Sequence, residues 1–207
     1  MRTAVRILAG STVAGTIVLL SLAAPVVYAP RAENPQAVTG DRLPGPPPGA
    51  AWIDGVRPRL ESMRLPTRGP DLDALLRTVD RASSRFSLDP VAVLAVILVE
   101  SRFDSDAVSP QGAMGLMQLQ AETARELAED LGIPWTSDQL LHDPETNVLL
   151  GTYYLSRLVH RFGDLDLALA AFNAGPGRVQ AVAGAAPCGY ANRVWDAVIR
   201  LRLRPLA

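Results

Sequence analysis

The sequence predicts an all-α fold, and three observations support this prediction. In residues 71–86 the apolar side chains recur at spacings of three and four, which is the period of one face of an α-helix. Two Asp-Pro pairs, Asp89-Pro90 and Asp143-Pro144, each join a helix N-cap residue to a proline at the first helical position. No apolar–polar alternation of useful length, the pattern of a half-buried strand, is present.

The predicted helices follow one another from residue 71 to the C-terminus. After the helix of residues 71–86, a second runs from Val91 to about Phe103 and is apolar on every side. A helix without a polar face belongs in the middle of a core. The remaining helices are expected over residues 122–131, 143–162, 166–172, 176–183 and 190–203.

Residues 30–70 differ in composition from the helical region. They hold nine prolines and five glycines, which is typical of a semi-rigid linker. Within this range, residues 51–65 include Trp52, Ile53, Val56 and Leu60 and are expected to dock as a short segment on the folded domain. The predicted organisation is an export segment at 1–29, a linker at 30–70 and a globular helical domain at 71–207.

The N-terminus has the pattern of a secretory signal. Arg2 and Arg6 precede an uncharged, apolar run of 23 residues, 7–29. This run is also long enough to span a bilayer as an anchor helix. Small residues before Ala24 offer a cleavage site, whereas the alternative site is followed by Pro30, which disfavours it. We therefore expect export to the cell envelope, either secreted or anchored in the membrane; a buried core helix is the disfavoured alternative.

Composition excludes several classes of function. The net charge is -1, so no global basic field exists to bind nucleic acid. Cys188 is alone, and one cysteine with two histidines cannot form a zinc site, so we expect neither a metal nor a cofactor. His142 and His160 are interpreted as surface or structurally satisfied residues, and the protein partners are not predictable.

Glu100 is the most informative single residue. It ends the apolar helix, where an unpaired carboxylate would be costly. Burial favours the neutral form and raises the pKa, and a carboxylic acid that stays protonated near neutral pH is suited to general acid catalysis. The alternative is that Glu100 turns outward or pairs with Arg102 or Arg125. On the helix pattern alone, this alternative is the stronger one.

Two polar and glycine-rich segments follow Glu100 and change that balance. In the first, Gly112 and Gly115 precede Gln118, an amide among apolar residues that is suited to bind a sugar hydroxyl or N-acetyl group. No Gly-Lys-Ser/Thr follows, so the segment is not a phosphate-binding loop. In the second, Asn173 stands at a helix end before a Gly-Pro-Gly sequence. Taken singly, each segment is better explained as a turn and a cap.

Together, these features resemble the catalytic domain of the soluble lytic transglycosylases, a family related to goose-type lysozyme. The resemblance covers residues 71–207 and rests on several motifs in order: Glu100-Ser101 with Phe103, the segment from Ser109 to Leu119, Thr123-Ala124, Asn147 with Gly151, Tyr154 and Leu155, the Asn-Ala-Gly-Pro-Gly segment, and Tyr190.

The resemblance implies a lysozyme-like helical fold and a set of site residues. Glu100 would be catalytic, and the side chains lining the substrate cleft would be Ser109, Gln118, Phe172, Asn173 and Tyr190. The chain departs from the family pattern at Phe172, where tyrosine is usual, and at Gln120-Ala121, where Met-Pro is usual. These departures leave the apolar frame intact and put the rate and the binding of individual sugars in question.

The resemblance also implies a mechanism with one carboxyl group. Most glycosidases use two carboxylates, about 5 Å apart in retaining enzymes and roughly 6.5–9.5 Å in inverting ones. In the family, the single acid protonates the leaving oxygen of the peptidoglycan glycan strand, and the 6-hydroxyl of the muramyl sugar then closes a 1,6-anhydro ring. A hydrolase on the same frame is an alternative that requires Asp104 or Asp106 to face Glu100. A non-catalytic peptidoglycan-binding scaffold is another, favoured by Phe172 and disfavoured by Glu100 with its loop.

Overall fold

A computed structural model describes residues 51–63, 69–180 and 188–203, with nine helical elements in these ranges. The described part has no strand, and its extended backbone is limited to isolated bridges that join Met114 to Val108 and to Leu119. The all-α prediction is confirmed. The predicted export segment, 1–29, lies outside the described residues.

The helices are α1 Ala51–Ser62, α2 Leu72–Phe86, α3 Pro90–Glu100, α4 Ala121–Leu131, η1 Asp138–His142 (a 3-10 turn), α5 Pro144–Phe162, α6 Leu165–Ala174, α7 Pro176–Gln180 and α8 Cys188–Arg202.

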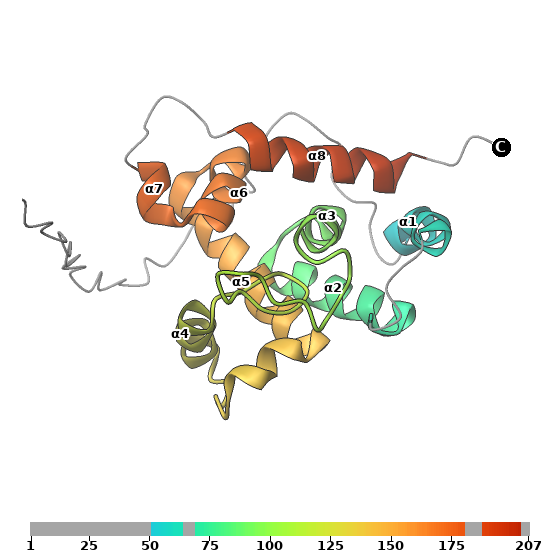
Figure 1. Ribbon diagram of the computed structural model, residues 1–207. Helices are drawn as coiled ribbons and strands as arrows, with labels where there is room; N and C mark the ends of the chain where they lie inside the picture. The colour runs from blue at the N-terminus through green and yellow to red at the C-terminus, as the bar shows by residue number, and fades with distance from the viewer. Residues whose placement is uncertain (1–50, 64–68, 181–187, 204–207) are drawn as a thin grey trace, which may run out of the picture. The chain divides into compact units, whose positions relative to one another are not determined.

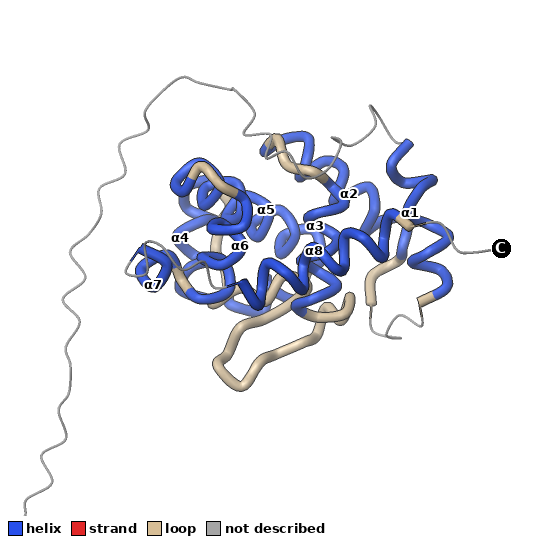
Figure 2. The backbone as a smooth tube through the Cα atoms, turned by 90° about the horizontal axis from the view of Figure 1, so that it is seen from above, coloured by secondary structure: helices blue, strands red, loops and turns tan. Residues whose placement is uncertain are grey.

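Helix α3 is the centre of the core, as its apolar sequence predicts. It packs against α8 on one side and against α2 and α1 on the others (Figure 1). In the view from above, α8 lies over α3 (Figure 2). The side chains from Val93 to Ile97 are 0% exposed. Because burying each large aliphatic side chain contributes about 1.5–3 kcal/mol, this helix supplies a large share of the apolar stabilisation.

The predicted end of this helix, about Phe103, is wrong. Helix α3 ends at Glu100, because Arg102 and Phe103 have φ values of +52° and +69° and leave the helical backbone conformation. Phe103 is 1% exposed, so its ring is buried in the core. The packing of this ring decides where the helix stops.

The predicted linker range of residues 30–70 includes a helix that is part of the core. Three residues of α1, Trp52, Val56 and Leu60, are at most 3% exposed. The indole N–H of Trp52 donates to Asp80 Oδ1 of α2 at 2.8 Å. The docking segment expected from the apolar residues is therefore a packed helix against α3 and α8.

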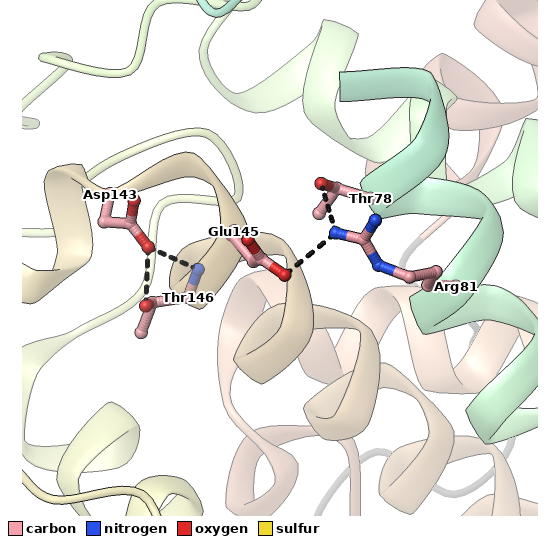
Figure 3. A network of polar contacts seen from close by, with 5 residues as sticks. All are labelled: Thr78, Arg81, Asp143, Glu145 and Thr146. Atoms are coloured by element: carbon pink, nitrogen blue, oxygen red, sulfur yellow. Dashed lines mark hydrogen bonds and ion pairs between the residues drawn. The ribbon is translucent and has the colours of Figure 1, made fainter. Parts of the chain in front are cut away.

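Helix α5 begins as its Asp-Pro pair predicts and is linked to α2. Asp143 Oδ2 accepts the backbone N–H of Thr146 at 2.8 Å and its hydroxyl at 2.6 Å (Figure 3). In the same first turn, Glu145 Oε1 accepts from Arg81 of α2 at 2.8 Å, and the same guanidinium nitrogen reaches the Thr78 hydroxyl at 3.3 Å (Figure 3). The Arg81–Glu145 ion pair is exposed, so it contributes little to the stability of the fold.

The C-terminal helices match their predicted positions to within a few residues. Helix α6 extends two residues beyond the predicted end, and α8 begins at Cys188, two residues before the predicted start. Residues 181–183 of the helix predicted over 176–183 lie outside the described residues. None of the helices in the described ranges is long and apolar enough to cross a membrane.

Candidate active site

Glu100, the last residue of α3, is half-buried and directly bonded to α8. The hydroxyl of Tyr190 donates to Glu100 Oε1 at 2.5 Å. Burial raises the pKa of Glu100 above its ordinary value, while the Tyr190 hydrogen bond and the charge of Arg193 lower it without cancelling the rise. The carboxyl group therefore keeps its proton to a higher pH than an ordinary glutamate does.

Tyr190 is a permanent donor to this carboxyl group. It lies in the first turn of α8 and is 4% exposed. Burial, followed by the charge of Glu100 and the hydrogen bond to it, raises the pKa of Tyr190 well above its ordinary value. The phenol stays protonated at any physiological pH, so it can hydrogen-bond to Glu100 in both protonation states of the carboxyl.

The backbone that follows Glu100 is fixed by Ser101 and Phe103. The Ser101 hydroxyl donates to the carbonyl oxygen of Leu116 at 2.8 Å, which joins the end of α3 to the loop of residues 101–120. Two consecutive residues in the left-handed region, Arg102 and Phe103, cost about 1–2 kcal/mol each. The buried Phe103 ring offsets this cost, so α3 ends where Glu100 reaches the site.

Asn147 of α5 organises the loop of residues 101–120, drawn in tan in Figure 2. Its side chain is 0% exposed; Oδ1 accepts the N–H of Met117 at 2.8 Å, and Nδ2 donates to the carbonyls of Met114 (3.0 Å) and Leu141 (2.8 Å). In the sequence, Asn147 is one of the residues that resemble the family, but no role was assigned to it. The feature that could have indicated its role is a polar side chain at a position of α5 that faces the core.

Two glycines are required by close packing around this loop. A Cβ atom on Gly115, whose φ is +76°, would lie 2.0 Å from the Leu141 carbonyl oxygen and 2.3 Å from Asn147 Nδ2. A Cβ atom on Gly151 of α5 would lie 2.4 Å from the sulfur of Met117. The loop can approach α5 this closely only with glycine at both positions.

Ser109 and Gln118, predicted to bind substrate, both shape the loop. Ser109 Oγ accepts the N–H of Ala113 at 3.0 Å and closes a tight turn. Gln118 has a φ of +49°, and its side-chain nitrogen donates to the carbonyls of Ala107 (3.1 Å) and Gly115 (2.9 Å). The amide hydrogens of Gln118 are therefore engaged by the loop itself, and contact with a substrate stays a prediction for both residues.

Phe172 and Asn173 stand near the end of α6. Phe172 is half-buried and packs against the ring of Tyr154, with ring centroids 5.4 Å apart. Asn173 is exposed, two residues before Gly175, whose φ is +86°. Of the predicted site residues, Tyr190 is the one that contacts Glu100 directly in the described structure.

The alternative partners considered for Glu100 are engaged elsewhere or exposed. Arg125 pairs with Asp138 at 3.4 Å, and Arg102 is exposed. Asp104 Oδ1 accepts the backbone N–H of Asp106 at 3.0 Å, within its own turn. Among the described residues, no three His, Cys, Asp or Glu side chains are grouped so that they could hold a metal ion. Within the described ranges, the groups that act on the Glu100 carboxyl are the phenol of Tyr190 and the guanidinium of Arg193.

Comparison with known proteins agrees with this fold. The model of the transglycosylase SLT domain family matches residues 77–187. The chain belongs to this family. The predicted resemblance is confirmed, and the matched range extends from α2 across α3, the loop and α5 to α7.

Among its relatives are two named transglycosylases. The chain is 42% identical over 89 residues to the soluble lytic murein transglycosylase of Escherichia coli K12, a match that covers 42% of this chain and 14% of that protein. It is 37% identical over 135 residues to the membrane-bound lytic murein transglycosylase F of Desulfosudis oleivorans, covering 62% of this chain and 27% of that protein. The chain thus spans well under a third of the length of these relatives.

Solved structures share the fold. The 70 kDa soluble lytic transglycosylase of Escherichia coli superposes with a TM-score of 0.58 at 31% identity, over 69% of this chain and 25% of that one. An inactive glutamate-to-glutamine mutant of the lytic transglycosylase Slt of Pseudomonas aeruginosa gives a TM-score of 0.52 at 32% identity, over 74% and 27%. The predicted lysozyme-like helical fold is confirmed by this likeness.

Proposed function

We propose that this chain is a peptidoglycan lytic transglycosylase. It cleaves the β-1,4 bond between N-acetylmuramic acid and N-acetylglucosamine without water and leaves a 1,6-anhydromuramyl end, with Glu100 as acid and then as base. The observation that carries the proposal is the single carboxyl group of Glu100, half-buried at the end of α3 and hydrogen-bonded to Tyr190 at 2.5 Å.

In the first step, Glu100 protonates the leaving glycosidic oxygen. This step needs a carboxyl group that is still protonated near the working pH, and the raised pKa of Glu100 supports that role. The N-acetyl group of the muramyl sugar can stabilise the positive charge that develops at the sugar carbon. When Glu100 has lost its proton, the Tyr190 hydroxyl remains as a donor that stabilises the carboxylate.

In the second step, the Glu100 carboxylate takes the proton from the 6-hydroxyl of the same muramyl sugar. A hydroxyl held next to the reacting carbon has an effective concentration of up to about 10⁵–10⁸ M, far above that of bulk water. No second carboxylate is then needed to activate water. The hydrogen bond from the Asp106 backbone to Asp104 within its own turn supports this one-acid scheme.

The known relatives support the same assignment. Proteins named lytic murein transglycosylases match 42% and 62% of this chain, and a mutant of the structurally similar lytic transglycosylase Slt in which a glutamate is replaced by glutamine is inactive. We propose that the substrate is the peptidoglycan glycan strand and that the side chains contacting it are Ser109, Gln118, Phe172, Asn173 and Tyr190.

The products formed from purified cell-wall sacs test the proposal. Digestion in ¹⁸O-labelled water followed by mass spectrometry should give muramyl ends that are 1,6-anhydro, resist borohydride reduction and carry no ¹⁸O. Reducible, ¹⁸O-labelled ends would show a hydrolase, and Asp104 and Asp106 would be the first residues to mutate. Binding to the sacs with no released fragments would show a scaffold.

We also propose that the domain works outside the cytoplasmic membrane. The basic and apolar pattern of residues 1–29 and the proline-rich segment after it support this placement. Deletion of residues 2–29 should leave an active domain in the cytoplasm, whereas the full-length protein should fractionate with the membrane or outside it. Recovery of the full-length protein in the cytosol would contradict the proposal.

A further inference from the structure

Arg193 lies one turn after Tyr190 on the same face of α8. Residues three apart on a helix are neighbours, and the Arg193 guanidinium carbon is 5.3 Å from the centroid of the Tyr190 ring. The hydroxyl of that ring is the one that donates to Glu100. Arg193 is exposed, and the ion pairs found among the described residues do not include it. Within the described part of the chain, Arg193 therefore makes no direct ion pair that would hold its guanidinium away from the Tyr190 ring.

We propose that Arg193 is a positioning residue of this site: its guanidinium holds the Tyr190 ring in place and favours the Glu100 carboxylate that the second step needs. The inference rests on the proposed function. It adds a third group to the site, one that neither the predicted residues nor the matched motifs include.

The proposed reaction explains why such a group is useful. One carboxyl group must first donate a proton and then accept one, so its two protonation states must be close in free energy near the working pH. Burial alone favours the neutral state of Glu100. It would keep the carboxyl protonated for the first step but disfavour the carboxylate that the second step needs. The Arg193 cation next to the Tyr190 ring opposes the effect of burial, because its positive charge lowers the pKa of Glu100.

Other charged groups on the surrounding elements do not replace this effect. Around Glu100, the groups that shift its pKa are Tyr190 and Arg193, both from α8. In the loop after α3, Asp104 binds the Asp106 N–H. Asp196, one turn after Arg193 on α8, is exposed. Five other charged side chains on α8 and the helices around it contact other partners: Arg57 contacts Asp73, Asp80 Trp52, Arg81 Glu145, Asp166 Trp195, and Arg202 Asp89.

Two substitutions of Arg193 separate its charge from its bulk. Arg193→Gln removes the charge and keeps much of the stem, whereas Arg193→Lys keeps a charge over the ring. The matched control is Arg200→Gln, the same change at an exposed position two turns further along α8, about 10 Å away along the helix axis. Two quantities are measured at low ionic strength, where exposed charges are least screened: the pH dependence of glycan cleavage, and the pKa of Glu100 by NMR of ¹³C-carboxyl-labelled glutamate, assigned with Glu100→Gln.

The proposal predicts the direction in which the pKa of Glu100 changes. Without the cation, the ionised form of Glu100 is less favoured, so the pKa of Glu100 rises in Arg193→Gln. The alkaline limb of the pH–rate profile, where the acid has lost its proton, then moves to higher pH. Arg193→Lys and Arg200→Gln should stay close to wild type, and added salt should shrink the difference between Arg193→Gln and wild type.

Two outcomes overturn the inference. One is an unchanged Glu100 pKa in Arg193→Gln, and the other is an equal shift in Arg193→Lys, which would mean that bulk and not charge is responsible. The NMR titration does not require turnover. If the protein cleaves no glycan, the proposed function fails, while the titration still shows whether Arg193 acts on Glu100.

Discussion

Replacing Glu100 with glutamine tests the central role assigned to this residue. The amide is nearly the same size as the carboxylic acid, and it keeps an oxygen that can accept the hydrogen bond from Tyr190. In the wild-type protein this hydrogen bond is 2.5 Å long. It has no transferable proton for the leaving oxygen, and it cannot take one from the 6-hydroxyl. Positioned general acid–base groups contribute about 10²–10⁴-fold in rate, so we expect at least this loss of glycan cleavage in Glu100→Gln.

The same substitution has a predictable effect on stability. Burial raises the pKa of Glu100 in the folded state above its ordinary value of 4.5. The stability contributed by the neutral carboxyl is therefore fully present below the ordinary pKa and is lost as the pH rises through the raised pKa. Because glutamine does not ionise, Glu100→Gln escapes this loss. It should be at least as stable as wild type near neutral pH, and its advantage should disappear as the pH falls below the ordinary value.

Three measurements check both effects. Clearing of a peptidoglycan suspension gives activity, co-sedimentation with cell-wall sacs gives binding, and thermal unfolding followed by circular dichroism over a pH series gives stability. Glu122→Gln, the same change at an exposed position in the first turn of α4, is the matched control and should keep its activity. Clearing by Glu100→Gln near the wild-type rate would refute the catalytic assignment. A loss of stability at neutral pH would refute the reasoning on burial.

The remaining predictions concern the groups around Glu100. Tyr190→Phe should lower the free energy of unfolding by about 1–3 kcal/mol and move the alkaline limb of activity to higher pH, since the hydroxyl favours ionised Glu100; an unmoved limb in the pH–rate profile would contradict this. Gly115→Ala should cost roughly 2–5 kcal/mol in chemical denaturation, because its Cβ would lie 2.0 Å from a carbonyl oxygen, whereas Gly112→Ala, with open space around it, should show only the smaller cost of positive φ. Phe172→Tyr should raise turnover modestly, by a hydrogen bond worth about 0.5–1.5 kcal/mol; unchanged or lower turnover would mean that another group already makes this contact.

The sequence by itself determined the all-α class and most helix positions, and it singled out Glu100 as the candidate acid. Local periodicity and caps are properties of neighbouring residues, so the Asp89 and Asp143 starts and the all-apolar character of α3 could be recognised directly. The carboxylic acid at the end of such a helix could be recognised as a candidate for a raised pKa, although only the motifs after it favoured burial over an outward-turned side chain. The order and spacing of several motifs, from Glu100-Ser101 to Tyr190, were sufficient to predict the family.

Only the tertiary structure decided which groups surround Glu100. Tyr190 is 90 residues away along the chain, and its contact with Glu100 exists because α8 packs over α3. Arg193 has no signal of its own in the sequence, since an exposed arginine on a helix is ordinary until the ring beneath it is known. The end of α3 was likewise set by the buried Phe103 ring, which outweighs the helical propensity of the residues before it. Contacts between distant helices depend on the free energy of the whole packed core, which no local pattern contains.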